Sequence, residues 1–455
     1  MILALCAVFL SGCDISDAIR KAEKEQEHVK IELPGDVPND TGVAASEEED
    51  SGAQTQNKPG EIEVIDINGE RIETSVDVVE DAEAEDNASV LPDVSLAQVA
   101  QNMSVADVSN FAYSELDESG KKCYREILAV LNDMLVKVEL SSLDPDEVDL
   151  AFRACMLDHP EIFYVKGYSI VKFMNGKRLD KIAFSGTYTM TADEVKKARN
   201  DVEEYVNRVI AACPQDAGDY EKIKYVYDYL ITSNEYVKDS PDNQNILSVV
   251  RNGKTVCQGY TKVMQLLLNR MGVFCTLVNG TACGRSGVPS ADELKNAKDA
   301  EWGGHVWNIV KCNGLYYNVD VTWGDSGITL LNNDGTLSRD VEVNYEFFLV
   351  KDDYLIGTHD PKPVVPMPVC NSMTDSYYMH EGLYFTDVDP GQFYRVFEKA
   401  LSSGGNIVFI KASDSNVYER IMNHLFEEQN VFDYMGRTNV RYVEFEERNL
   451  IMISL

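Results

Sequence analysis

The sequence predicts an α+β fold in which a helix that carries a cysteine packs on an antiparallel sheet that carries a histidine and an aspartate. Two patterns predict it. Apolar residues recur at helical spacing after Cys257, and two β-rich runs, 305–311 and 315–323, are separated by Asn313-Gly314. An Asn-Gly pair between two such runs is the strongest short-range signal for a β-hairpin.

The helix is predicted to begin at Cys257 and to end before Gly272. Its apolar residues fall at i, i+3, i+4, i+7, i+8 and i+11, which is the stripe of a helix packed by one face: Tyr260, Val263, Met264, Leu267, Leu268 and Met271. A cysteine in the first turn faces unpaired backbone N–H groups and the positive end of the helix dipole, which favour a thiolate over a thiol. Taken alone, Cys257 would more often be a buried structural cysteine.

The hairpin register relates the histidine to the aspartate. If residues 313 and 314 form the loop, residue 312 faces 315, so His305 lies opposite Thr322 and Asp320 lies opposite Trp307. His305 and Asp320 then project from the same face as diagonal neighbours, about 7–8 Å apart at the backbone. A carboxylate at this distance reaches the imidazole and can fix its tautomer, while the other ring nitrogen faces the thiol. A lone histidine beside a tryptophan is usually a packed core residue.

Three segments resemble the transglutaminase-like superfamily, whose members share a papain-like core: Cys-Gln-Gly-Tyr at 257–260, Gly-Gly-His-Val-Trp-Asn at 303–308 and Tyr-Tyr-Asn-Val-Asp-Val-Thr-Trp at 316–323. The resemblance extends from about Tyr220 to Asp325. It implies that Cys257 is the nucleophile, His305 the base and Asp320 the orienting carboxylate. Residues 158–164 and 345–348 also look similar to bacterial surface members of this group.

The remaining site predictions concern binding. All three tryptophans, Trp302, Trp307 and Trp323, lie around the predicted His and Asp. We expect them, with Gln258, to contact substrate, although large aromatic residues are as often packing. We expect no cofactor and no metal, because no Cys-x-x-Cys pair and no histidine cluster exists in the sequence. The acidic run 332–335 lacks the ligand spacing of a calcium loop.

Composition excludes one class of partner. The chain has 455 residues, 41 Lys plus Arg against 76 Asp plus Glu, and a formal net charge of −35. Binding to a nucleic-acid backbone needs a basic footprint, so we expect no nucleic-acid partner. Between residues 14 and 92 there are 23 acidic and 6 basic residues, an excess of 17 that is nearly half of the total of 35. That segment therefore differs in composition from the rest of the chain.

The N-terminal residues resemble an export signal. Residues 1–10 are a short apolar run, and Leu-Ser-Gly-Cys at 10–13 resembles a bacterial lipobox, in which Cys13 would receive lipid. No Lys or Arg precedes the run, which departs from the usual pattern. Residues 14–95 are too acidic and too poor in apolar residues to fold, so we expect a disordered tether. The predicted location is the outer side of a bacterial membrane, through a lipid anchor at Cys13.

The domain prediction follows from these patterns. We assign residues 96–214 to an accessory α/β region, 215–358 to the catalytic core and 370–455 to a small α+β domain after a proline-rich linker. In the accessory region we expect a helix with an apolar stripe at Leu128, Leu131, Leu135 and Val138, a hairpin at Asn175-Gly176 between the strand-rich runs 162–173 and 181–190, and a helix opened by Thr191. In the small domain we expect a strand near 377–386. We expect a thiol enzyme that acts on amide bonds of proteins or peptides, by hydrolysis or acyl transfer. The alternative is a peptide-binding or scaffold lipoprotein that keeps the fold without catalysis. The substrate, the acyl acceptor and the oligomeric state are not specified by the sequence.

Overall fold

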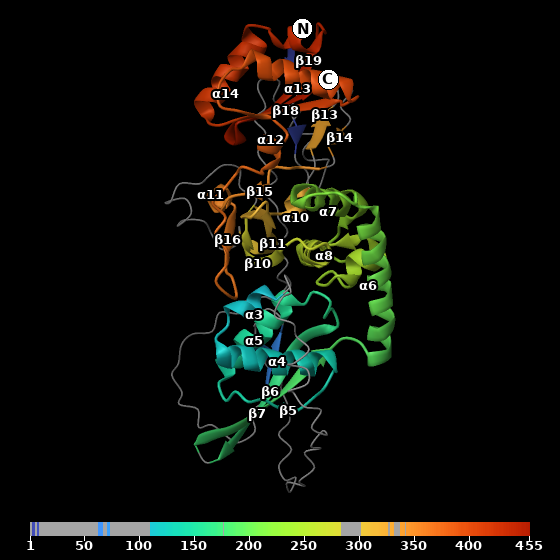
Figure 1. Cartoon of the computed structure of the whole chain (residues 1–455), viewed down its shortest axis with the longest axis vertical. Helices are drawn as coiled ribbons and strands as arrows, with labels where there is room; N and C mark the ends of the chain where they lie inside the picture. Colours follow the sequence, from blue (N-terminus) through green and yellow to red (C-terminus); the bar gives the residue numbers. More distant parts are fainter. Residues whose placement is uncertain are drawn as a thin grey trace.

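The computed structural model describes residues 110–283 apart from 176, residues 302–455 apart from 326–327, 332–336 and 342, and four short strands near the N-terminus. The fold is α+β, with helices packed against largely antiparallel sheets. Along the long axis of the molecule, a helical layer with its own sheet lies at one end, the sheet of the predicted site lies in the middle, and the C-terminal sheet lies at the other end (Figure 1). No helix among the described residues is long and apolar enough to cross a membrane.

The first region packs three helices on a five-stranded sheet of order β4-β3-β6-β7-β5. The helices are α3 (Phe111–Glu115), α4 (Glu118–Asn132) and α5 (Pro145–Asp158). The strands are β3 (Ile62–Asp66), β4 (Arg71–Ile72), β5 (Val138–Glu139), β6 (Val165–Asn175) and β7 (Arg178–Tyr188). The hairpin predicted around Asn175 is confirmed, since Asn175 pairs with Arg178. Strand β3 pairs with β6, so part of the segment expected to be a tether contributes a strand.

One helix prediction in this region is wrong at its end. The apolar spacing of Leu128, Leu131, Leu135 and Val138 indicated a helix that continued to 138. Helix α4 stops at Asn132, and Met134 and Lys137 adopt positive φ angles of 53° and 56°. An L-residue in the left-handed region cannot continue a right-handed helix. Val138 instead begins strand β5.

Two helices lead from this region to the central sheet. Helix α6 (Ala192–Ala212) begins with a capping box between Thr191 and Glu194, as expected for a helix opened by Thr191. It runs along one side of the molecule beside both regions (Figure 1). Helix α7 (Asp219–Ser233) follows and packs on α8 (Cys257–Arg270). One apolar core continues from the first region into the central one.

The central sheet has the order β15-β12-β11-β10-β16. Its strands are β10 (Cys275–Ala282), β11 (Gly303–Cys312), β12 (Leu315–Val319), β15 (Phe348–Val350) and β16 (His359–Pro361). The predicted hairpin register is confirmed, because Cys312 pairs with Leu315 and Asn308 with Val319. Both loop residues have positive φ angles, 49° at Asn313 and 87° at Gly314. A two-residue hairpin turn of the kind that Asn-Gly favours requires this conformation.

The second strand of the hairpin is shorter than predicted. Strand β12 ends at Val319, and residues 321–324 form the short helix α10 (Val321–Gly324) with Asp320 as its N-cap. Asp320 Oδ1 accepts a hydrogen bond of 3.0 Å from the Trp323 backbone N–H. The expected strand pairs of Thr322 with His305 and of Asp320 with Trp307 are therefore absent from the described register. The hairpin turn itself lies at Asn313-Gly314, where it was predicted.

The C-terminal region forms a separate apolar core. Its sheet has the order β1-β19-β20-β18-β17, and the main helices are α13 (Pro390–Ser402), α14 (Ser415–Met422) and α15 (Val431–Met435). The strands are β17 (Tyr384–Phe385), β18 (Ile407–Ala412), β19 (Val440–Phe445) and β20 (Leu450–Ser454). The strand expected at 377–386 is mostly wrong, because it begins with helix α12 (Tyr377–His380).

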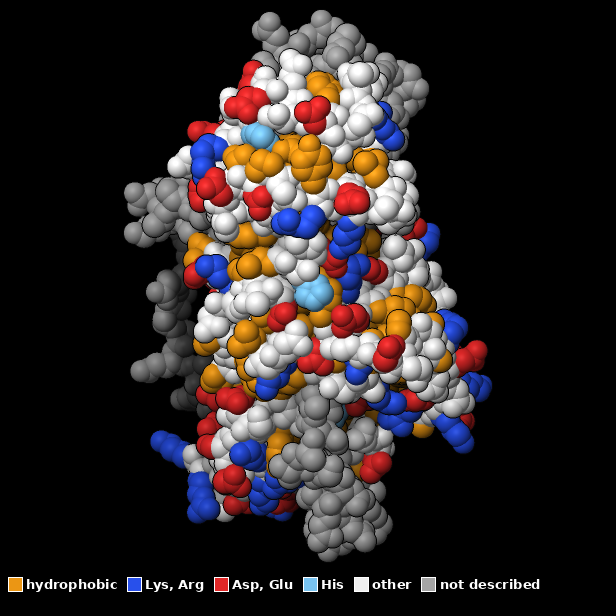
Figure 2. Space-filling model, turned by 45° about the horizontal axis from the view of Figure 1, so that its top comes forward, with side chains coloured by type: hydrophobic (Ala, Val, Ile, Leu, Met, Phe, Trp, Pro, Cys, Tyr) orange, Lys and Arg blue, Asp and Glu red, His pale blue; other side chains and the backbone are white. Residues whose placement is uncertain are grey.

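The N-terminal residues also add strands to this half of the molecule. β1 (Ile2–Ala4) pairs in parallel with β19, and β2 (Ala7–Val8) pairs with β13 (Ile328–Leu331), which in turn pairs with β14 (Leu337–Val341). Cys13 and the acidic run 332–335 lie outside the described residues. Over the described part of the face in Figure 2, acidic and basic side chains are interspersed rather than segregated by sign.

Candidate active site

Cys257 is the first residue of α8, as the sequence predicted. The preceding strand β9 (Lys254–Thr255) pairs in parallel with β8 (Glu235–Tyr236), which fixes the chain just before the thiol. The N-cap residue is Val256, and no side chain caps this end of the helix. The first N–H groups of a helix have no partner within the helix, so this uncapped end can donate hydrogen bonds to a negatively charged oxygen. Cys257 itself is only 6% exposed.

Gly259 allows this close packing around the start of α8. A Cβ at this position would lie 1.9 Å from Thr255 Oγ1 and 2.8 Å from Ser248 Oγ. Those two hydroxyls are themselves hydrogen bonded at 2.7 Å and lie directly beneath the helix end. The glycine in Cys-Gln-Gly-Tyr is therefore required by sterics, because no other residue fits between the helix and the strand that leads to the thiol.

His305 and Asp320 form a buried pair. His305 Nε2 lies 2.6 Å from Asp320 Oδ2, and the two side chains are 1% and 2% exposed. Burial opposes the charged imidazolium, but the charge of Asp320, its hydrogen bond and the Cys257 sulfur outweigh burial and raise the pKa of His305 to about 10. Burial likewise opposes the Asp320 carboxylate, yet the charges and hydrogen bonds of the two neighbouring histidines hold the pKa of Asp320 below its usual value.

The second nitrogen of His305 remains available. Nδ1 is buried and has no hydrogen-bond partner among the described residues, while the Cys257 thiol is close enough to interact with the ring. Asp320 therefore contacts Nε2 of the imidazole, and Nδ1 remains free on the side of Cys257. The structure therefore brings together Cys257, His305 and Asp320 from one helix and the two sides of the hairpin.

A second histidine, His359, completes this arrangement and was not predicted from the sequence. Its Nε2 lies 3.0 Å from Asp320 Oδ2, and its Nδ1 lies 2.9 Å from Thr358 Oγ1. His359 stands on β16, which pairs with β10 at the edge of the sheet. Burial is the main cause of its lowered pKa, so the ring is neutral at neutral pH and donates from Nε2 to the carboxylate. No local motif marks position 359, since it lies 39 residues from Asp320.

Another glycine brings β16 near enough for this contact. A Cβ on Gly280 would lie 2.4 Å from the Asp360 carbonyl oxygen and 2.9 Å from the Trp307 ring. Gly280 pairs with His305 on one side and with Pro361 on the other. A side chain here would separate the two strands that carry the two histidines.

The tryptophans divide into different roles. Trp307 is 1% exposed, stacks 6.2 Å from the His305 ring and donates from Nε1 to Asn318 Oδ1. Its ring packs against both His305 and His359, and its predicted contact with substrate stays a prediction. Trp323 is partly exposed and lies 4.7 Å from His359 and 6.3 Å from His305. Trp302 and Gln258 are partly exposed, and their predicted binding roles stay predictions.

The same cluster contains the ligand types of a metal site. One ligand atom each of His305, Asp320 and His359 lies within 4.8 Å of the others. No sequence pattern indicates this cluster, because His359 lies 39 residues from Asp320. In the structure both Nε2 atoms are directed at the same carboxylate oxygen at hydrogen-bond distances, which is the arrangement of two donors on one acceptor. These residues could hold a cation such as zinc only if both imidazoles gave up their protons to accept it.

Comparison with protein families agrees with this geometry. Residues 203–321 match the family model of the transglutaminase-like superfamily. The matched segment includes α7, α8 and the hairpin, and so it contains Cys257, His305 and Asp320. A curated relative, the Kyphoscoliosis peptidase of Mus musculus, is 26% identical over 167 residues, covering 35% of this chain and 24% of that protein.

This chain therefore corresponds to about a quarter of the length of that curated relative. Among solved structures, it is similar to a TGase, with a TM-score of 0.22 and 13% identity over 33% of this chain and 44% of the other. It is also similar to a proposed cysteine protease from Cytophaga hutchinsonii, with a TM-score of 0.21 and 11% identity over 39% and 63% of the two chains. Likenesses this low carry no argument about function.

Proposed function

We propose that this chain is a thiol enzyme that acts on amide bonds of proteins or peptides, with Cys257 as nucleophile, His305 as base and acid, and Asp320 as the orienting carboxylate. The observation that carries the proposal is the buried His305–Asp320 pair, whose imidazole keeps Nδ1 open on the side of Cys257. The match of residues 203–321 to a superfamily of transglutaminase-like proteins supports it.

In the proposed mechanism, the Cys257 sulfur attacks a carboxamide or peptide carbonyl while His305 holds the proton from the thiol. The C–N bond then breaks, the imidazolium gives its proton to the departing amine, and a thioacyl group remains on Cys257. Water or a second amine attacks this group and loses a proton to His305, the C–S bond breaks, and the imidazolium returns the proton to the Cys257 sulfur. Asp320 stabilises the imidazolium at each step.

The negative charge that develops on the carbonyl oxygen needs hydrogen-bond donors. The backbone N–H of Cys257 is the first donor we propose, because the helix end carries no side-chain cap. Gln258 or a residue near Tyr236 would supply the second. Strand β8, which contains Tyr236, runs directly beside the residues that precede Cys257, and this supports the second choice.

We favour hydrolysis over cross-linking as the resting reaction. An amine must compete with water at tens of molar, so cross-linking requires a shielded acceptor channel that hydrolysis does not need. The alternative function is a non-catalytic peptide-binding scaffold. A scaffold has no need for a buried His–Asp pair directed at a thiol. Burying two charged groups costs free energy, and only catalysis would gain from the pair.

The proposed location is the outer face of a bacterial membrane, through lipid on Cys13 and the acidic segment 14–95. It depends on the lipobox resemblance alone. The protein is proposed to meet extracellular proteins or peptides there, with no nucleic-acid partner.

The deciding experiment incubates the protein with a library of glutamine-containing peptides and a labelled primary amine, and mass spectrometry scores free acid, cleaved peptide and amine adduct. We expect acid or cleaved peptide that disappears in the Cys257→Ala variant. Predominant amine adduct at millimolar amine would contradict the preference for hydrolysis. The absence of any Cys257-dependent product would favour the scaffold.

A further inference from the structure

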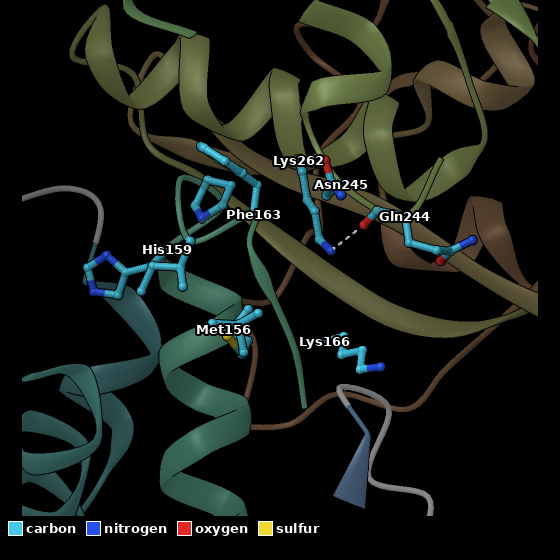
Figure 3. Close-up of a pocket in the computed structure, with 10 residues that line it drawn as sticks. Met156, His159, Phe163, Lys166, Gln244, Asn245 and Lys262 are labelled. Atoms are coloured by element: carbon cyan, nitrogen blue, oxygen red, sulfur yellow. Dashed lines mark hydrogen bonds between the residues drawn. The ribbon is translucent and has the colours of Figure 1, made fainter. Parts of the chain in front are cut away.

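A small pocket lies where the connection between α5 and β6 faces helix α8 (Figure 3). It encloses about 70 Å³, several times the roughly 10–15 Å³ that one water needs. Met156, Ile162, Phe163 and Val165 supply an apolar wall, and Lys262 and Gln244 supply the opposite, polar wall. Ile162 and Phe163 belong to the segment 158–164 that resembles bacterial surface members of the superfamily, a segment with no part in the mechanism above.

Lys262 is a largely buried cation without a carboxylate partner. Its ammonium reaches into the pocket and donates one hydrogen bond of 2.8 Å to the Gln244 carbonyl oxygen (Figure 3). Among the described residues it forms no ion pair. Burial lowers the pKa of Lys262 to about 8, and the Cys257 sulfur only partly opposes this effect. An ammonium has three N–H donors, so two remain for a ligand.

A buried charge is stable only when it is paired and hydrogen bonded. The protein's overall charge of −35 does not attract anions, so any anion that binds here must be recognised locally by this lysine and its surroundings. The apolar wall favours a ligand that carries hydrocarbon next to its negative group. A carboxylate attached to an aliphatic or aromatic body meets both conditions, whereas a bare inorganic anion meets only the first.

The pocket shares helix α8 with the nucleophile. Lys262 lies five residues after Cys257, about 7.5 Å further along the helix axis, although Cys257 itself does not line the pocket. We propose that this pocket is a substrate subsite that binds a carboxylate of a peptide, held by the Lys262 ammonium and packed against Met156 and Phe163. The carboxylate can come from a chain terminus or from an acidic side chain. The link to catalysis rests on the proposed function, whereas binding to the pocket does not.

The test therefore uses the Cys257→Ala protein, which binds but cannot react. Two matched probe pairs are titrated into it at pH 8: N-acetyl-leucine with N-acetyl-leucinamide, and N-acetyl-glutamate α-amide with N-acetyl-glutamine α-amide. The ¹³Cε resonance of Lys262, in protein labelled with [ε-¹³C]lysine, reports the pKa of the ammonium. Other ionisable groups at the pocket are Lys166, which is exposed, and His159, whose Nδ1 is hydrogen bonded to Glu161.

We expect at least one carboxylate, but neither matched amide, to raise the Lys262 pKa on binding. The first pair identifies a chain terminus as the source and the second an acidic side chain. Adding Lys262→Met should weaken carboxylate binding about tenfold or more, because a hydrogen bond to a charged group is lost, whereas Lys166→Met should not. If neither carboxylate moves the Lys262 signal, or the amides move it equally, the lysine is structural and the proposal is wrong. The titration retains native Lys262, so this conclusion holds even if Lys262→Met fails to fold.

Discussion

His359 and Asp320 meet at 3.0 Å, and the carboxylate oxygen that His359 contacts is the same oxygen that His305 contacts at 2.6 Å. One aspartate oxygen therefore serves two imidazoles from different strands. Together with the Trp323 backbone N–H on Oδ1, these contacts leave the carboxylate a single orientation.

We expect His359 to act as a positioning residue. Replacing it with Leu should lower kcat by about 10–100-fold with a smaller effect on KM, as is typical when the partner of a functional side chain is lost. His359→Gln places an amide N–H near the position of Nε2 and should restore most of the activity. Steady-state kinetics on both variants test this. Equal loss in Leu and Gln, with an unchanged pH profile, would indicate a purely structural role.

Cys257 should react with iodoacetamide near neutral pH before any other described cysteine. All eight described cysteines are buried, and burial raises the pKa of several others, to about 12 for Cys123. The His305 imidazole interacts with the Cys257 thiol, so His305→Ala should slow its labelling. Peptide mapping after timed alkylation measures both. Similar rates at all cysteines, unaffected by the His305 substitution, would count against the proposed triad.

The charged His305–Asp320 pair should make stability depend on pH at the alkaline end. The pKa of His305 is raised from its ordinary 6.5 to about 10, so its contribution to the free energy of unfolding is full below pH 6.5 and is lost as pH rises through about 10. Asp320, whose pKa is lowered, contributes above its ordinary value of 3.8 and loses this contribution as pH falls.

Urea unfolding between pH 6 and 10.5 measures the first effect. The wild-type protein should lose stability more steeply towards pH 10 than His305→Gln, and His380→Gln, at an exposed histidine outside the site, should follow the wild type. Parallel curves for the wild type and His305→Gln would contradict the imidazolium form of the pair.

Gly259→Ala should destabilise the protein by about 2 kcal/mol or more, because overpacking of this kind typically costs about 1–3 kcal/mol and the new Cβ would overlap Thr255 Oγ1. Gly304→Ala is the matched control, since nothing lies within 4 Å of its Cβ position, and it should change stability by less than about 0.5 kcal/mol. Chemical denaturation gives both values. Thr255→Ala should partly rescue Gly259→Ala. A Gly259 effect as small as that of Gly304 would refute the steric argument.

Cys13→Ala should move the protein from the membrane fraction to the soluble fraction, or leave an uncleaved precursor, when expressed in its native host. The expected mass of the mature N-terminus includes lipid on Cys13. Fractionation that does not change, with no lipid mass at Cys13, would remove the basis for the proposed location.

The sequence was most informative where chemistry and local geometry coincide. The register of the 305–319 hairpin follows from Asn313-Gly314, which predicts that His305 and Asp320 lie close together, and the start of α8 at Cys257 follows from the apolar stripe after it. The position of Cys257 relative to the hairpin was implied only by the family resemblance. Asp320 was expected in a strand because Val319, Val321 and Thr322 are β-branched. The N-cap formed by its side chain overrides that preference over such a short segment.

The parts that could not be predicted depend on contacts between distant segments. His359 reaches Asp320 only because Gly280 lets β16 pair closely with β10, and neither residue carries a local signal of that pairing. The burial of Trp307 depends on the sheet packed around it, which the spacing of tryptophans along the chain does not reveal. The turn after Asn132 is set by two positive φ angles that the apolar spacing of the leucines does not indicate.

Asp320 joins two tasks in one carboxylate, since Oδ1 caps α10 and Oδ2 accepts from the imidazoles. The orientation of the catalytic ring and the folding of the adjacent helical turn are consequently a single event. A substitution that gives the Asp320 side chain more freedom would also release the backbone that carries Trp323. Thermal fraying of that one turn would switch the site off reversibly while the rest of the fold stays intact.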